Sequence, residues 1–279
     1  MNAHFLRSIR PHPVVVFLVL ANVLTMGLLA AANLDILDPA RLACRYAAKF
    51  GPSLAACVAA IVVWGAPGAK ALLRSLMRWR VSIWWYTLAA GGPLALVALA
   101  MFIVAATGGS VTRANATPWL VLAAFVKPIL LGGGLGEEIG WRGYLLPLLQ
   151  RRWGPIRASL SVGVCWGLWH SPAFLVTGTG KSGGAGGLVV LTILCVVLST
   201  IFTWVFNASG GRLSVLILLH GCFNGSLDAG DLLFPNAEPD LYVAIALLVI
   251  AVTLTATTRL GSPARTPLGD LMDTHAPLN

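Results

Sequence analysis

Two adjacent carboxylates, Glu137 and Glu138, stand in a stretch of sequence that is otherwise almost free of acidic residues. Arg142 follows Glu138 by four residues, so in a helix the two side chains share one face. The acid precedes the base, which is the favourable order for an ion pair. Glu137 is rotated by about 100° from Glu138 and points elsewhere. The two neighbouring acids can therefore take different roles.

Two histidines and an amide supply the other polar groups suited to chemistry. They are His170, His220 and Asn224, and the last two are four residues apart on one helical face. A carboxylate and an imidazole that share one water can remove its proton. A second imidazole and a carboxamide can then donate hydrogen bonds to the oxyanion formed when that water attacks a carbonyl. These residue types indicate peptide-bond hydrolysis without an enzyme-bound nucleophile.

The elements that must position these residues are membrane-spanning helices. Hydrophobic residues make up 57% of the 279 residues and charged residues 10%, and the mean hydropathy is +0.83. An ordinary soluble domain is more polar than this. Apolar runs of about 20 residues recur, each long enough to cross ~30 Å of hydrocarbon. We expect an all-α integral membrane protein, a single bundle of about eight transmembrane helices, at roughly residues 14–32, 50–66, 84–106, 118–150, 156–175, 187–207, 213–233 and 241–258.

Helix geometry places the polar residues of separate spans at similar depths. Measured from the basic loop that joins two antiparallel spans, Glu137 lies ~21 Å along one span and His170 lies ~23 Å along the other. In the seventh span, His220 and Asn224 lie ~12 Å and ~18 Å from the start. An ionisable group in lipid is costly unless it faces the bundle interior. We therefore predict a water-filled polar cavity inside the bundle.

The basic residues are concentrated in alternate loops. With the N-terminus inside, the inside segments hold twelve Lys and Arg residues and the outside segments hold five. This asymmetry predicts a multi-pass protein of a bacterial cytoplasmic (plasma) membrane with both termini cytoplasmic. Basic loops beside anionic lipid also account for the net charge of +9, so the expected partner is the lipid bilayer and not nucleic acid. Residues 70–86 predict a short basic helix on the membrane surface.

Three motifs resemble those of the CPBP family of intramembrane proteases, which includes the type II CAAX prenyl endopeptidases and bacteriocin-processing proteins. The resemblance covers about residues 84–230 and rests on EEIGWR, on WGLWH ending at His170, and on HGCFN beginning at His220. The second motif commonly begins with phenylalanine, and this chain has Trp166 in that place. The motifs occur in order and on separate predicted spans, which makes their combination specific.

The resemblance implies a role for each motif residue. Glu137 would activate the water, and His170 would help to bind and orient it. His220 with Asn224 would stabilise the oxyanion, while Glu138 would shape the site. The residues expected to brace the site are Arg142 and Trp166. The implied substrate is a membrane-associated peptide or a lipidated protein, and the sequence identifies neither the substrate, nor whether it is prenylated, nor an oligomeric state.

Three other interpretations of the polar residues remain open. Glu137, His170 and His220 could ligate a divalent metal such as zinc. The sequence lacks HEXXH, and we favour the interpretation without a cofactor. A non-catalytic scaffold, immunity protein or transporter is the second alternative. Finally, the ion pair of Glu138 and Arg142 could be purely structural.

The chain divides into three predicted regions. Residues 1–83 hold two spans and the basic amphipathic segment, residues 84–258 form the protease-like core, and residues 259–279 form a flexible tail. Within the core, the stretch GGGLG at residues 132–136 either widens the cavity by a kink or allows a close helix crossing. A second glycine-rich stretch, residues 178–187, is expected to be an outer loop.

Overall fold

The computed structural model of the chain describes residues 12–32, 41–175 and 184–275. In these residues it is built from helices and contains no β-strand. Most of the glycine-rich loop predicted at residues 178–187 lies outside the described residues. The described helices are α2 (Pro13–Ala31), α3 (Arg41–Ala48), α4 (Gly51–Trp64), α5 (Ala66–Leu76), α6 (Ile83–Ala106), α7 (Pro118–Leu131), α8 (Gly133–Gly140), the π-helix η2 (Trp141–Leu145), α9 (Leu146–Trp169), α10 (Ser171–Leu175), α11 (Gly184–Ala208), α12 (Leu213–Leu233), α13 (Asp240–Thr258) and α14 (Pro267–His275).

The long apolar helices confirm an all-α membrane protein, and their number is close to the prediction. Six described helices are long and apolar enough to cross a membrane, or seven if the bent pair α3–α4 forms one span, where about eight were predicted. One of the six is the 52-residue stretch Pro118–Trp169, which includes α7, α8, η2 and α9. A straight helix of that length would measure ~78 Å, far more than a bilayer. The chain instead turns at Gly154, whose φ of 72° and ψ of 174° are not helical, so this helix contains two of the predicted spans.

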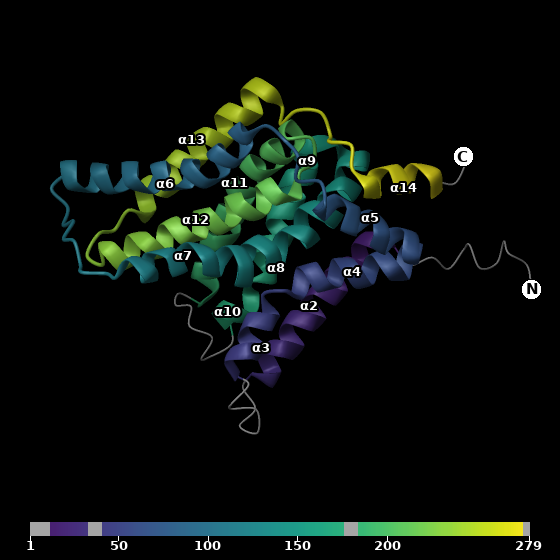
Figure 1. The fold of residues 1–279 in the computed structure, drawn as a ribbon, viewed down its shortest axis with the longest axis horizontal. Coiled ribbons are helices and arrows are strands. Elements are labelled where there is room, and N and C mark those ends of the chain that lie inside the picture. Colours follow the sequence, from purple (N-terminus) through teal and green to yellow (C-terminus); the bar gives the residue numbers. More distant parts are fainter. Residues whose placement is uncertain (1–11, 33–40, 176–183, 276–279) are drawn as a thin grey trace, which may run out of the picture.

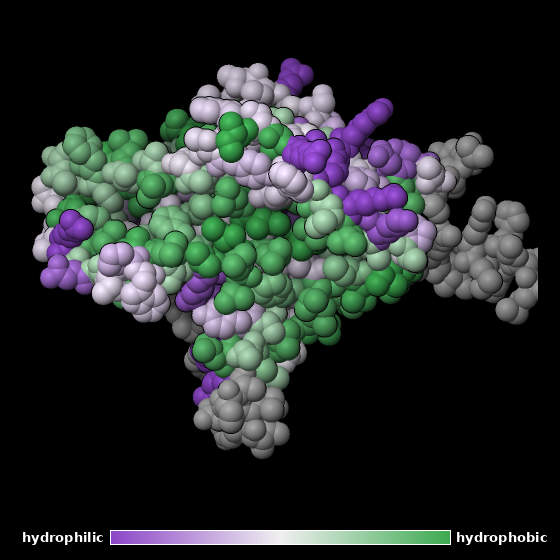
Figure 2. All heavy atoms as spheres, viewed as in Figure 1, coloured by the Kyte–Doolittle hydropathy of each residue, from purple (hydrophilic) through white to green (hydrophobic). Residues whose placement is uncertain are grey.

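The structure gathers the predicted cytoplasmic segments at one end of the bundle. Arg78 donates to the carbonyl oxygens of Arg265 and Gly210, and Arg212 donates to that of Arg80. At the opposite end, the backbone N–H of Ala114 bonds to the carbonyl of Leu233 at 2.7 Å. Figure 1 shows α6, α7 and α12 running along the long axis between these ends, and in Figure 2 hydrophobic residues cover most of the middle of the visible face. Which end faces the cytoplasm stays a prediction.

The C-terminal segment, for which a flexible tail was predicted at residues 259–279, packs against the bundle over its described part. Leu260 and Leu268 are fully buried. Asn207 on α11 donates to the carbonyl of Leu260 at 3.0 Å, and an ion pair of 2.6 Å joins Arg151 to Asp273 on α14. Flexibility was predicted from the polar composition of the segment, while buried apolar side chains attach its described part to the bundle.

Candidate functional site

The two glutamates lie on α8, a short helix whose glycines let it approach its neighbours closely. Gly132 separates α8 from α7, and α8 packs against α4 and α12, as Figure 1 shows. A Cβ atom on Gly133 would lie 2.3 Å from Nε2 of His220, and one on Gly136 would lie 2.6 Å from the carbonyl oxygen of Lys49. Neither position accepts a side chain without movement. The geometry therefore favours the close helix crossing over the kink as the reason for GGGLG.

Glu138 is the centre of a buried charge network. Its Oε1 accepts hydrogen bonds from Nη1 of Arg142 and from Nδ1 of His220, both at 2.7 Å. The side chains of Glu138 and Arg142 are fully buried. The guanidinium carbon of Arg142 lies 4.5 Å from the ring centroid of Trp166 and 4.7 Å from that of Phe202, which stabilises the cation between two aromatic faces. The predicted pair of Glu138 and Arg142 is confirmed as an ion pair.

The network is incompletely hydrogen-bonded within the described residues. Arg142 lies in η2, a single π-helical turn of the kind that often occurs at functional sites. Oε2 of Glu138 and both Nε and Nη2 of Arg142 are buried without a hydrogen-bond partner among the described residues. Buried polar atoms normally bond to protein or to ordered water. This part of the bundle thus has hydrogen-bonding capacity for small polar molecules.

His220 has a defined hydrogen-bonding direction. A carboxylate oxygen can only accept, so Nδ1 of His220 carries the proton that it donates to Glu138. The opposite nitrogen, Nε2, is directed toward Gly133 at the first turn of α8. The ring also packs edge-on against Trp166 and Phe202, with centroids 5.2 Å and 5.6 Å away. This link between His220 and Glu138 was not predicted from the sequence.

Trp166 connects Glu137 with His170. Its indole N–H donates to Oε2 of Glu137 at 2.6 Å, and its backbone carbonyl accepts a 2.8 Å hydrogen bond from Nδ1 of His170. Because a carbonyl oxygen cannot donate, Nδ1 of His170 carries its proton and Nε2 is left with a lone pair in the neutral ring. Glu137 is 6% exposed, while His170 is half-buried. Trp166 thus links Glu137 on α8 with His170 at the end of α9.

Asn224 lies on α12 one turn beyond His220 and is half-buried. The i, i+4 spacing keeps both side chains on the same side of the helix. Gly225 next to it would place a Cβ atom 2.8 Å from the ring of Phe125 on α7, so α12 and α7 are in close contact there. The role of Asn224 in the site stays a prediction.

Sequence reasoning missed several residues near the site. Phe202 gave no signal because an apolar residue in an apolar helix has nothing to distinguish it. Lys127 did give a signal in the sequence, because it is a lone cation in the apolar stretch PWLVLAAFVKPILL of α7. Its Nζ lies 5.8 Å from the ring centroid of Tyr46, and Nζ of Lys49 lies 5.4 Å from the same centroid. Asp228, two turns beyond His220, is within electrostatic reach of both lysines.

The alternative metal site is not assembled in the described residues. No group of three or more His, Cys, Asp or Glu side chains there is close enough to hold an ion. Glu137, His170 and His220 instead use Oε2 and the two Nδ1 atoms for the protein hydrogen bonds given above. Metal-ligating histidines commonly use one ring nitrogen for such a bond, so these contacts leave the metal alternative from the sequence open.

Comparison with known proteins covers the same part of the chain. Residues 98–226, which contain all three motifs, match the family model described as type II CAAX prenyl endopeptidase Rce1-like. A protein from Methanococcus maripaludis named CAAX prenyl protease 2 is 27% identical over 139 residues, which are 47% of this chain and 51% of the relative. The chain thus spans about half the length of that relative. These matches confirm the predicted resemblance over this region and support a protease family of the CAAX type.

Proposed function

We propose that this protein is an intramembrane endopeptidase that hydrolyses a peptide bond of a membrane-associated or lipidated protein by means of an activated water. The observation that carries the proposal is the double contact of Trp166, whose side chain holds Glu137 and whose carbonyl holds His170. A carboxylate and an imidazole held by one residue could act together on one water molecule between them. The family match supports the same class of reaction.

In the proposed first step, Glu137 removes a proton from the water. His170 orients that water through the lone pair of Nε2, which accepts its other hydrogen, because Nδ1 is committed to the carbonyl of Trp166. The water oxygen bonds to the scissile carbonyl carbon, and the carbonyl π electrons move onto oxygen. General-base catalysis of this kind contributes about 10²–10⁴-fold to a rate.

In the proposed second step, the tetrahedral oxyanion is stabilised and then collapses. Nδ1 of His220 is bound to Glu138, so the ring is held in place, and in its imidazolium form Nε2–H can donate to the oxyanion. The amide of Asn224 donates a second hydrogen bond. When the C–N bond breaks, the proton held by Glu137 passes to the leaving nitrogen. Each oxyanion donor of this type contributes about 10²–10³-fold.

The test is cleavage of a membrane-peptide library by the purified wild type and by Glu137→Gln, with and without a chelator. We expect Glu137→Gln to lose activity while keeping its helical content, and the chelator to leave the wild type unchanged. Glu238→Gln is the matched control, because this acid is exposed in the loop before α13. Loss of wild-type activity in chelator would contradict the metal-free mechanism. A wild type that cleaves nothing, with a cellular phenotype that survives Glu137→Gln, would leave the scaffold interpretation.

A further inference from the structure

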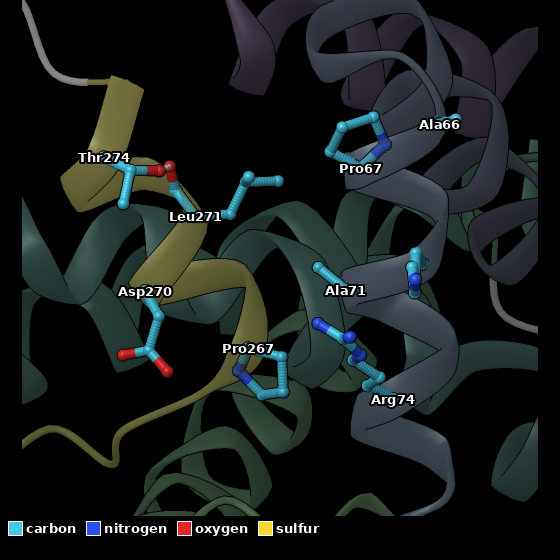
Figure 3. A pocket seen from close by; sticks show the side chains of 9 residues that line it. Ala66, Pro67, Ala71, Arg74, Pro267, Asp270, Leu271 and Thr274 are labelled. Atoms are coloured by element: carbon cyan, nitrogen blue, oxygen red, sulfur yellow. Dashed lines mark hydrogen bonds between the residues drawn. The ribbon is translucent and has the colours of Figure 1, made fainter.

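A cleft of about 690 Å³ lies between α5 and α14, apart from the glutamate site. It is lined on one side by Lys70, Ala71 and Arg74 of α5, and on the other by Asp270 and Leu271 of α14. In Figure 3 the side chain of Arg74 extends from α5 toward α14. The cleft therefore combines cationic groups with an apolar wall, and it is formed by the C-terminal segment that was predicted to be flexible.

The exposed face of α5 suits the boundary between lipid and water. Lys70, Leu73, Arg74 and Met77 follow one another at helical spacing, and Leu73 and Met77 are 57% and 65% exposed. The opposite face of α5, which includes Leu72, is buried in the bundle. A helix that alternates cations with large exposed apolar residues lies with its apolar side chains in the acyl region and its cations at the head groups.

The charge around the cleft favours an anion. Lys70 and Arg74 line it, and Arg78 follows one turn later, against the single acid Asp270. Burial and the nearby Arg212 hold the pKa of Arg78 below its ordinary value, whereas Asp270 opposes that shift. The other acid of α14 among the described residues, Asp273, is already paired with Arg151. The cations therefore outnumber the free acid at the cleft.

We propose that this cleft binds the head group of an anionic phospholipid, with the phosphate between Lys70 and Arg74 and an acyl chain along Leu73 and Met77. A phospholipid matches both parts of the site, because the phosphate satisfies the cations and the chain covers the exposed apolar residues. The lipid would join α5 to α14 and so hold the C-terminal helix on the bundle. This site is independent of the proposed hydrolysis, since it shares no residue with the glutamate site.

The test is retention of phosphatidylglycerol by the purified full chain, measured by native mass spectrometry after extraction from nanodiscs that contain phosphatidylglycerol and phosphatidylcholine. We expect the wild type to retain phosphatidylglycerol in preference to phosphatidylcholine. The variant Lys70→Gln/Arg74→Gln should retain at least roughly tenfold less phosphatidylglycerol than the wild type, because each cation near the membrane surface contributes to binding. The matched control is Arg157→Gln, an exposed cation outside the cleft.

A second variant keeps the test decisive if the double variant does not fold. Asp270→Asn removes the opposing charge and should raise retention of phosphatidylglycerol above that of the wild type. Equal retention by the wild type and the folded double variant, or a decrease in Asp270→Asn, would overturn the proposal. Displacement of the lipid by inorganic phosphate alone would show a free phosphate site in place of a lipid site, and equal retention of phosphatidylcholine would show a non-selective surface.

Discussion

The side chain and the backbone of Trp166 each hold one of the two groups proposed to bind water. Phenylalanine, common at this position in the family that the chain resembles, could supply the carbonyl but not the indole N–H. The same ring lies against the Arg142 guanidinium and the His220 imidazole. Trp166 therefore connects the hydrolytic pair with the charge network, and one substitution can separate its hydrogen bond from its aromatic packing.

Trp166→Phe is expected to lower kcat by roughly tenfold to a hundredfold, in line with the loss of one hydrogen bond that positions a catalytic group. The aromatic ring is retained, so KM and the helical content should change little. Steady-state cleavage and circular dichroism would measure these quantities. Trp153→Phe is the matched control, because Trp153 is 43% exposed and lies near the turn at Gly154. An unchanged kcat in Trp166→Phe would show that the indole N–H does not position Glu137.

Part of this residue-level arrangement could be predicted from the sequence. The i, i+4 pair of Glu138 and Arg142 follows from helix geometry alone, and it is present. The hydrogen bond between His220 and Glu138 could not be predicted, because depth estimates give the level of a residue in the bilayer but not the rotation of its helix. The contact of Trp166 with Glu137 was missed for the same reason.

At the scale of the elements, α8 is held between α4 and α12 by backbone contacts at its glycines. Gly136 approaches the carbonyl of Lys49, while Ser53 on α4 donates to the carbonyl of Leu135 at 2.9 Å. These contacts fix the position of α8, and with it the direction in which Glu137 points. The chain turn at Gly154 then returns Trp166 to the level of Glu137.

Gly133→Ala is expected to reduce activity much more than stability. Its new methyl group would lie 2.3 Å from Nε2 of His220, so the imidazole must move away from α8. The expected result is a loss of kcat of at least about tenfold, since displacing an oxyanion donor has effects of this order. Gly27→Ala in α2 is the matched control, because its Cβ atom would meet nothing within 4 Å.

Cleavage assays and thermal unfolding in detergent would measure the two effects of Gly133→Ala. Full activity in this variant would mean that His220 can shift without cost to the reaction.

The sequence predicted the helices on both sides of GGGLG because their apolar runs are long. It could not choose between a kink and a close crossing, since that choice depends on which backbone lies opposite each glycine.

At the scale of the whole molecule, hydrogen bonds join segments that the charge pattern assigns to one side of the membrane. Arg78 reaches residues 210 and 265, and Arg151 reaches Gly269 on α14. The charge pattern predicted this grouping because basic loops accumulate on one side. It did not predict that residues 259–275 would pack on that side, because packing of this segment depends on the cavity that accepts Leu268.

The orientation of the molecule can be tested with single introduced cysteines. Ser262 lies at the basic end and Ser110 in the loop after α6 at the opposite end, and both are exposed. If the basic end is cytoplasmic, a membrane-impermeant maleimide applied to intact cells should label Ser110→Cys and not Ser262→Cys. Both should react once the membrane is permeabilised. The unaltered chain, with its five native cysteines, gives the background.

The reverse labelling pattern would contradict the positive-inside assignment while leaving the bundle itself unchanged. It would also place the α5–α14 cleft in the outer leaflet, so the lipid encountered by Lys70 and Arg74 would be that of the opposite surface. Because α3 and the α3–α4 junction lie on the side of the bundle away from α14, the lysines near Tyr46 would then face the cytoplasm. The labelling result thus decides to which aqueous side Lys49 and Lys127 are nearer.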